Sequence, residues 1–148
     1  KRRRMLAMPL AVPAMPEPSY ILTYDDGGWY EGSFTDTLDE HGHGTEFYKS
    51  GNRRYEGDWK NGAQEGYGTE YYEDGKRYEG DWKNGAQEGY GTEYYEDGKP
   101  LFVGWWRNGE YDCEQSGTFY SRDGRRLEFQ PTDINGNVMD TIYRTGPA

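Results

Sequence analysis

A string of 23 residues stands twice in immediate succession in this chain of 148 residues. Residues 54–76 read RYEGDWKNGAQEGYGTEYYEDGK, and residues 77–99 repeat that string without a single change. Self-similarity at a fixed period is the signature of a repeat architecture, in which each unit buries its apolar face against its neighbours. The chain is therefore an array, and every candidate site has to be placed on the repeated unit.

The flanking sequence carries the same unit in altered form. Residues 30–48 match it with one extra residue in each loop, and residues 102–124 match it with two residues added between Trp106 and Gly117. Residues 20–30 align with residues 68–78, and Leu127 stands where a further unit would begin. We therefore divide the chain into an N-terminal segment 1–18, an array 19–130 and a C-terminal cap or tail 131–148. The array comprises a half-unit 20–29, units 30–53, 54–77, 78–101 and 102–126, and a closing strand 127–130.

The units share the pattern Y-x-G-x-W-x-x-G-x-x-x-G-x-G, followed seven residues later by glycine. This pattern resembles the MORN repeat, and the resemblance covers roughly residues 20–129. It implies an elongated array of β-hairpins that serves as a docking surface, beside catalytic domains or in scaffold proteins. It implies no catalytic residue, because the repeat has none.

The residues of one unit indicate a hairpin without that resemblance. In residues 55–60 aromatic and glycine positions alternate with charged ones, which is the period of a strand with one covered face. Residues 61–65 contain the turn pair Asn-Gly, and residues 67–72 are predicted as the second strand. The sequence predicts an all-β fold, an elongated single-layer array of antiparallel β-hairpins with a short C-terminal cap.

The predicted core is aromatic. Leu, Ile, Val and Phe total only 17 residues and the net charge is −10, a composition that would ordinarily favour disorder. Four copies in register argue against disorder, so Tyr, Trp and Gly have to form the core. We expect Tyr55 and Trp59 to lie across the bare backbone of Gly66 and Gly68.

The first 18 residues differ in kind from the array. A basic start, Lys1–Arg4, precedes an apolar stretch, which is similar in outline to a secretory signal, although Pro9 and Pro13 count against a helical core. We expect residues 5–15 to lie along the aromatic face of the array as an extended or one-turn segment, in the manner of a ligand. A tag, linker or leader is the other interpretation. The candidate docking residues are Met5, Leu6, Met8, Leu10 and Val12.

Two classes of function remain open. The first is a non-catalytic scaffold that binds a peptide or protein segment on an aromatic sheet face, either its own N-terminal segment or that of a neighbouring chain. The second is a structural module that dimerises or stacks end to end through its open edges. The candidate partner-binding residues are Tyr55, Trp59, Tyr67, Tyr71, Tyr72, Tyr78, Trp82, Tyr90, Tyr94, Tyr95 and Trp106.

Charge bears on the class of partner. Each of the two identical units carries three basic and six acidic residues, so the array repels anionic lipid and nucleic acid and attracts a basic or amphipathic peptide. A phosphoinositide- or membrane-associated module is a third alternative. It would depend on Lys1–Arg4 and on the basic residues of 122–126.

The sequence predicts no enzyme, cofactor or metal site. The glycines are never followed by the Lys-Ser or Lys-Thr pair of a phosphate loop. His41 and His43 would share a strand face, but no third ligand is near in sequence. Residues 133–137 faintly resemble a calcium loop, yet position twelve is Arg144 in place of glutamate. The many acidic residues are interpreted as solvated turn and outward strand positions. A single cysteine, Cys113, allows no disulfide within the chain, and we favour a cytoplasmic setting.

Two identical units between divergent ends also bear on origin, because drift normally blurs tandem copies. We infer an engineered array of idealised units between end units from a natural protein. A recent natural duplication predicts the same sequence.

Overall fold

The computed structural model describes residues 3–7, 20–112 and 114–127. In these residues twelve β-strands form one sheet, and no helix occurs. The strands are β1 (Arg3–Ala7), β2 (Tyr20–Tyr24), β3 (Trp29–Phe34), β4 (Glu40–Phe47), β5 (Arg53–Lys60), β6 (Ala63–Tyr71), β7 (Arg77–Lys83), β8 (Ala86–Tyr94), β9 (Pro100–Arg107), β10 (Glu110–Tyr111), β11 (Gly117–Tyr120) and β12 (Arg126–Leu127).

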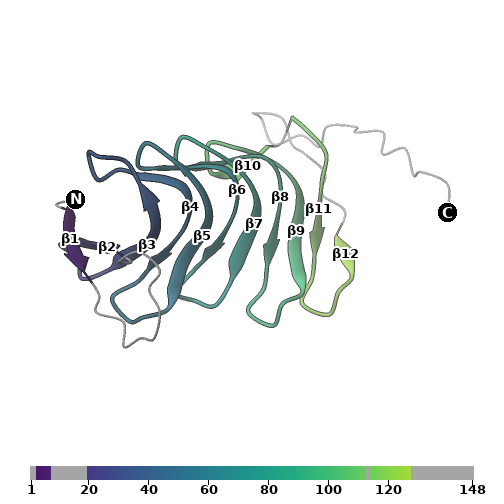
Figure 1. Ribbon diagram of the computed structural model, residues 1–148. Helices are drawn as coiled ribbons and strands as arrows, with labels where there is room; N and C mark the ends of the chain where they lie inside the picture. Colours follow the sequence, from purple (N-terminus) through teal and green to yellow (C-terminus); the bar gives the residue numbers. More distant parts are fainter. Residues whose placement is uncertain (1–2, 8–19, 113, 128–148) are drawn as a thin grey trace, which may run out of the picture.

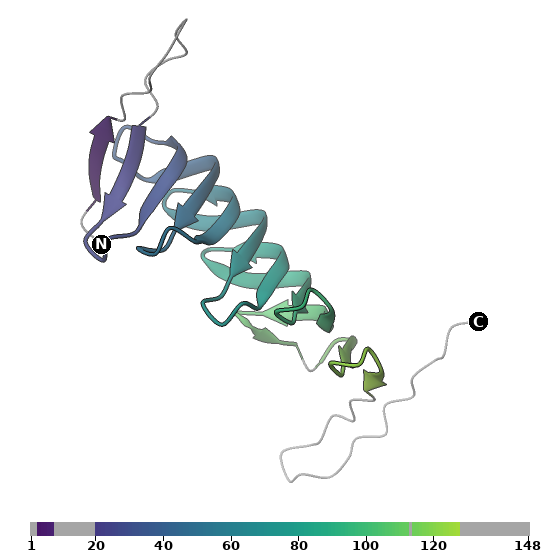
Figure 2. The same cartoon turned by 90° about the horizontal axis from the view of Figure 1, so that it is seen from below.

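The strands follow one another across the sheet in chain order, and every pair is antiparallel. Only β10 leaves this path, because it pairs with β9 beside β11. Figures 1 and 2 show an elongated ladder with β1 at one end and β12 at the other, its central strands bent like ribs. The predicted all-β, single-layer array of hairpins is confirmed. The predicted C-terminal cap lies outside the described residues.

Tight two-residue turns connect the hairpins of the central units. Asn61 and Gly62 have φ angles of 49° and 83°, and Asn84 and Gly85 have 50° and 81°. Two consecutive positive φ angles form the type I′ turn, whose twist matches that of the flanking strands. The second strand therefore begins at Ala63, so the prediction of a turn over 61–65 and a strand from Tyr67 was wrong.

A bulge interrupts the second strand of each central hairpin. The register passes from Trp59↔Gln64 to Gly57↔Gly68, which leaves three residues of β6 opposite the single residue Asp58. Gly66 lies in this bulge with a φ of 72°, and a Cβ there would meet the Asp58 carboxylate at 3.2 Å. A bulge bends its strand and increases the local twist. Gly66 therefore bends the strand and does not lie under a ring as we expected.

The aromatic rings pack inside the bend. A Cβ on Gly68 would lie 2.2 Å from the Tyr55 hydroxyl oxygen, so Tyr55 covers Gly68 as predicted. The Tyr55 hydroxyl reaches across the bend and donates to the carbonyl of Asp58 on its own strand, at 3.1 Å. Trp59 does not cover its own unit: its Nε1 donates to the carbonyl of Gly44 in the preceding unit, at 3.2 Å.

These rings form a continuous row along the concave side, which we call the ring ladder. Tyr55 meets Trp59 of its own unit and Trp82 of the next unit, with centroid distances of 5.0 and 5.1 Å and an interplanar angle of 84° for both. Edge-to-face contacts of this kind stabilise aromatic cores beyond the area that they bury. The ladder consists of Tyr30, Trp59, Tyr55, Trp82, Tyr78, Trp106 and Phe102.

The start of the N-terminal segment extends the sheet at its edge. β1 pairs with β2 from Arg3↔Tyr24 to Ala7↔Tyr20, and the side chains of Met5 and Leu6 are exposed. The expectation that these residues lie on the aromatic face was wrong, because the unpaired backbone of β2 offers them hydrogen bonds that a ring surface does not. Met8, Leu10 and Val12 lie outside the described residues.

Candidate partner-binding groove

The concave side of the sheet holds a row of inward-facing glutamates beside the ring ladder. Glu46, Glu70 and Glu93 each stand two residues after a ring-covered glycine, so strand alternation turns them to the same face. Glu46 is only 3% exposed, and the other two are half-buried. The interpretation of the acidic residues as solvated positions was therefore wrong for this row. The two-residue offset from Gly68 was the signal that could have found it.

Two adjoining hollows of about 460 Å³ each open beside these glutamates. Both are lined by Gln87 and Gly109, so they form one depression, which we call the concave groove. Its first half is lined by Arg54, Tyr55, Gln64, Glu70, Trp82, Gly85, Ala86, Gln87, Asn108 and Gly109. Its second half is lined by Tyr72, Gln87, Glu93, Trp106, Gly109, Glu110 and Tyr111.

Side-chain hydrogen bonds fix the floor of the groove. The Nε2 group of Gln87 lies 3.0 Å from the Glu70 carboxylate and 2.7 Å from the Tyr72 hydroxyl, and the Tyr111 hydroxyl donates to Glu93. Burial raises the pKa of the Glu70 carboxyl, although the hydrogen bond from Tyr72 and the charge of Arg54 act in the opposite direction. Burial also holds the pKa of Tyr72 well above its ordinary value, so its hydroxyl stays protonated. The groove thus combines rigid rings with one carboxylate, that of Glu70, which is costly to ionise.

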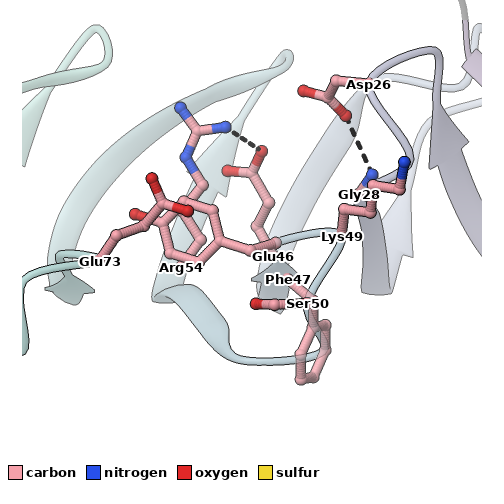
Figure 3. A pocket seen from close by; sticks show the side chains of 9 residues that line it. Asp26, Gly28, Glu46, Phe47, Lys49, Ser50, Arg54 and Glu73 are labelled. Carbon is pink, nitrogen blue, oxygen red and sulfur yellow. Dashed lines mark hydrogen bonds and ion pairs between the residues drawn. The ribbon is translucent and has the colours of Figure 1, made fainter.

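A smaller hollow of about 210 Å³ lies in the preceding unit, and there an arginine, Arg54, lies against the inward glutamate. Figure 3 shows the Arg54 guanidinium directed at Glu46, at 3.3 Å. The same guanidinium lies over the ring of Tyr48, 5.6 Å from its centroid. This unit shows how the fold receives a guanidinium at an inward glutamate.

A second arginine acts at the N-terminal end of the sheet. Arg3 of β1 forms ion pairs with Glu40 at 2.9 Å and with Asp39 at 2.6 Å. Glu40 is only 2% exposed, and it also accepts a hydrogen bond from the Tyr24 hydroxyl. Nothing in the sequence pointed to this buried carboxylate, which occupies the position of Gln64 and Gln87 in the later units.

Five of the predicted partner-binding rings belong to the core. They are at most 6% exposed, so they have no free face to offer a partner, and the interface role that we expected for them is corrected to a structural one. They are Tyr55, Trp59, Tyr78, Trp82 and Trp106.

The remaining predicted rings are divided between the two faces. Tyr72 lines the concave groove, and Tyr95 donates to the carbonyl of Tyr120 beneath the Arg122 guanidinium. On the convex face Tyr67 and Tyr90 are 60% and 50% exposed. Tyr71 and Tyr94 are covered there by arginines from their own chain. The sequence did not identify Glu70, Glu93, Gln87 or Tyr111 as groove residues.

Metal binding and membrane spanning find little support in the described part of the chain. His43 lies 3.3 Å from Asp58, and residues 3–7, 20–112 and 114–127 contain no group of three His, Cys, Asp or Glu side chains arranged to hold a metal ion. The same residues include no helix with the length and apolar character of a membrane span. Cys113 and residues 133–137 lie outside the described residues.

Comparison with protein families gives one match. The family model described as MORN repeat matches residues 39–53, 55–77 and 78–99, which correspond to β4 to β8 and their connecting turns. No curated protein matches the sequence.

Proposed function

Because the chain carries three MORN repeats, over residues 39–53, 55–77 and 78–99, we propose that it is a non-catalytic scaffold whose concave groove binds an extended peptide or protein segment. Hollows, rigid aromatic walls and directed polar groups meet in this groove. Sites that bind ligands characteristically combine these three features. The finding that carries the proposal is the continuity of the two hollows through Gln87 and Gly109.

The chemistry of the groove favours a basic or amphipathic segment. Glu70, Glu93 and Glu110 bring negative charge to it, and Tyr72 and Tyr111 supply ring surface. Opposite charge speeds encounter and selects the partner, and rigid rings provide contact area at a low cost in conformational entropy. An extended segment along the ladder would lie across the strands and meet equivalent positions of successive units.

Peptides selected from a random display library on the full chain test this proposal. Gln64→Tyr places a ring in the groove at the position that Tyr111 occupies in the fourth unit, so the fold already accepts it. We expect this substitution to weaken the selected peptides by about tenfold or more, because it fills part of the hollow. Isothermal titration calorimetry measures the change.

The matched control removes the exposed rings of the convex face. A Tyr67→Ser/Tyr90→Ser variant should bind the selected peptides as the parent chain does. If the convex variant loses binding and Gln64→Tyr keeps it, the partner site lies on the convex face and the groove proposal falls.

We also propose assembly through the N-terminal strand as a second candidate function. The favouring observation is that β1 adds to β2 as an edge strand, with Met5 and Leu6 exposed. A neighbouring chain's β1 could make the same backbone pairing, as in strand exchange. Light scattering over a hundredfold concentration range tests it, with the full chain compared to a chain that starts at Pro16. A mass that stays monomeric in both excludes assembly.

We further propose that the array is engineered and that membrane association is secondary. The sequence of the two units in residues 54–99 is identical, which supports engineering. The net negative charge of these units repels anionic lipid headgroups, which makes membrane association secondary. Coding DNA with different codons in the two identical units supports engineering, whereas identical codons indicate recent duplication. Binding to phosphatidylinositol-4,5-bisphosphate vesicles at physiological salt would restore the membrane alternative.

A further inference from the structure

Inward carboxylates recur along the concave side, and the first two are ion-paired with arginines of the same chain. Glu40 is paired with Arg3, and Glu46 is paired with Arg54. These two arginines come from different elements, the added strand β1 and the start of β5. The fold therefore neutralises the charge of an inward glutamate twice with an arginine, each time from a different strand.

A bulge explains why Arg54 faces inward. Glu46 pairs with Tyr55, but the next residue, Phe47, pairs with Arg53, so Arg54 is an extra residue on β5. Its counterpart Arg77 has no such bulge and pairs directly with Tyr71. Arg77 consequently turns to the convex face, where it lies 4.0 Å from the centroid of the Tyr94 ring and bonds to Glu79.

The later units thus keep the glutamate and lose the arginine. In the part of the chain that the structure describes, no ion pair joins Glu70 or Glu93 to a cation. The Arg54 guanidinium borders the same hollow as Glu70, but its ion pair is with Glu46. At the position of Arg54 the fourth unit has Leu101. Two half-buried carboxylates therefore face the groove with capacity for a further donor.

The geometry points to the missing donors: we propose that Glu70 and Glu93 each receive an arginine side chain from the bound segment. The inference rests on the proposed peptide groove and adds the partner's chemistry to it. Arg54 on Glu46 supplies the template, because Tyr72 is the sequence counterpart of Tyr48 and lines the groove, where a guanidinium on Glu70 can meet its ring.

The array also sets the spacing of the two arginines. Glu70 on β6 and Glu93 on β8 are both Cα partners of Tyr78, which lies on β7 between them. Two strand spacings amount to about 10 Å. An extended segment of the polyproline II type advances about 3.1 Å per residue and turns once in three residues, so side chains three residues apart lie on the same side and about 9 Å from each other. The bound segment therefore carries arginine at every third position.

Fluorescence anisotropy with the full chain tests this spacing and charge. The probe is a fluorescein-labelled, proline-rich peptide with arginine at every third position, since polyproline is already extended at about 3.1 Å per residue. Two further peptides serve as controls, one with citrulline in place of arginine and one with arginine at every second position. We expect the first probe to bind about tenfold more tightly than either control.

Matched substitutions locate the effect. Glu70→Gln and Glu93→Gln should each weaken the arginine probe by about tenfold and leave the citrulline peptide unchanged, because the amide keeps the shape and removes the charge. Glu79→Gln removes the same charge from β7, on the convex face between the two sites, and should change the affinity less than about twofold.

Three outcomes overturn the inference. These are equal binding of the citrulline peptide, equal losses in Glu79→Gln and Glu70→Gln, and no binding of the arginine probe. If library-selected peptides still depend on Gln64 in any of these cases, the groove stands and only its arginine specificity falls. If Gln64→Tyr leaves those peptides unaffected, the groove itself is excluded.

Discussion

At the scale of single residues, the fold depends on a glycine and a ring that fit each other. Gly68 has no side chain where Tyr55 lies, and the neighbouring unit repeats the contact with Gly91 and Tyr78. Glycine by itself weakens a strand because it has no side chain to pack, but the covering ring supplies that packing. The ring in turn bridges the bend through its hydroxyl. The two residues are therefore inseparable in their contribution to stability.

Gly68→Ala should destabilise the protein more than its single methyl suggests. The added Cβ would lie 2.2 Å from the Tyr55 hydroxyl oxygen and 2.4 Å from the ring carbon that carries it, and the ring is held on its other side by Trp59 and Trp82. Overpacking of this kind costs about 1–3 kcal/mol. Urea unfolding measures the loss, with Thr69→Ala as the neighbouring control on the opposite face. A Gly68→Ala variant as stable as Thr69→Ala would contradict the ring contact.

Glu70→Gln should stabilise the protein at neutral pH. Burial raises the pKa of Glu70 above its ordinary value of 4.5, so the folded state binds this proton more tightly than the unfolded state does. Stability therefore falls as the pH rises from 4.5 through the folded pKa, and the loss is complete above it. Melting temperatures across this range should show the variant above the parent at neutral pH and level with it below 4.5. A gap that does not vary with pH would contradict the assignment.

At the scale of the strand and hairpin, the sequence predicted the element types and missed their details. The pattern around Tyr55, Gly57 and Trp59 sufficed for the first strand, because alternation is a local property. The bulge at Gly66 was not predicted, since a glycine inside a strand is equally compatible with a covering ring and with a bulge. The inward direction of Glu70 was also not predicted, because a charged side chain was assumed to face solvent although strand alternation from Gly68 turns it inward. The pairing of β1 with β2 depends on an open edge that no local pattern reveals.

β1 should contribute to stability mainly through Arg3. Arg3→Met would leave Glu40 buried without its guanidinium, and we expect a loss of about 2 kcal/mol, given that the arginine itself is partly exposed. In a Glu40→Gln background the same substitution should cost little, because glutamine occupies this position as Gln64 and Gln87 in the later units. Chemical denaturation of the four variants forms a double-mutant cycle. Equal losses in both backgrounds would show that the ion pair is not what anchors β1.

At the scale of the whole molecule, the protein is one-dimensional. Each hairpin contacts only its neighbours, and the ring ladder passes from unit to unit without closing into a separate core. Stability is then the sum of unit terms and nearest-neighbour interface terms. The ends differ from the middle: β1 covers one edge, and β12 forms the other limit of the described sheet.

An inserted third copy of residues 54–76 should therefore raise stability. It adds one hairpin and one further Tyr–Trp contact at each junction, without altering either end. We expect the urea midpoint and the m-value both to increase, since the surface buried per molecule increases. Circular dichroism during urea unfolding measures both. A lengthened chain that unfolds at a lower midpoint, or in separate steps, would contradict nearest-neighbour additivity.

The exact identity of residues 54–76 and 77–99 has a consequence for folding. β4 pairs with β5, but β7 presents the same residues, so β4 can pair with β7 while 23 residues are looped out. Every strand of that shortened ladder still finds a matching neighbour, and only the ring contacts of one unit and the entropy of the loop distinguish it from the full fold. The chain thus encodes a near-native competitor that is displaced by one repeat. Stopped-flow refolding should show it as a slow phase, which disappears when the two copies are made different at their convex positions.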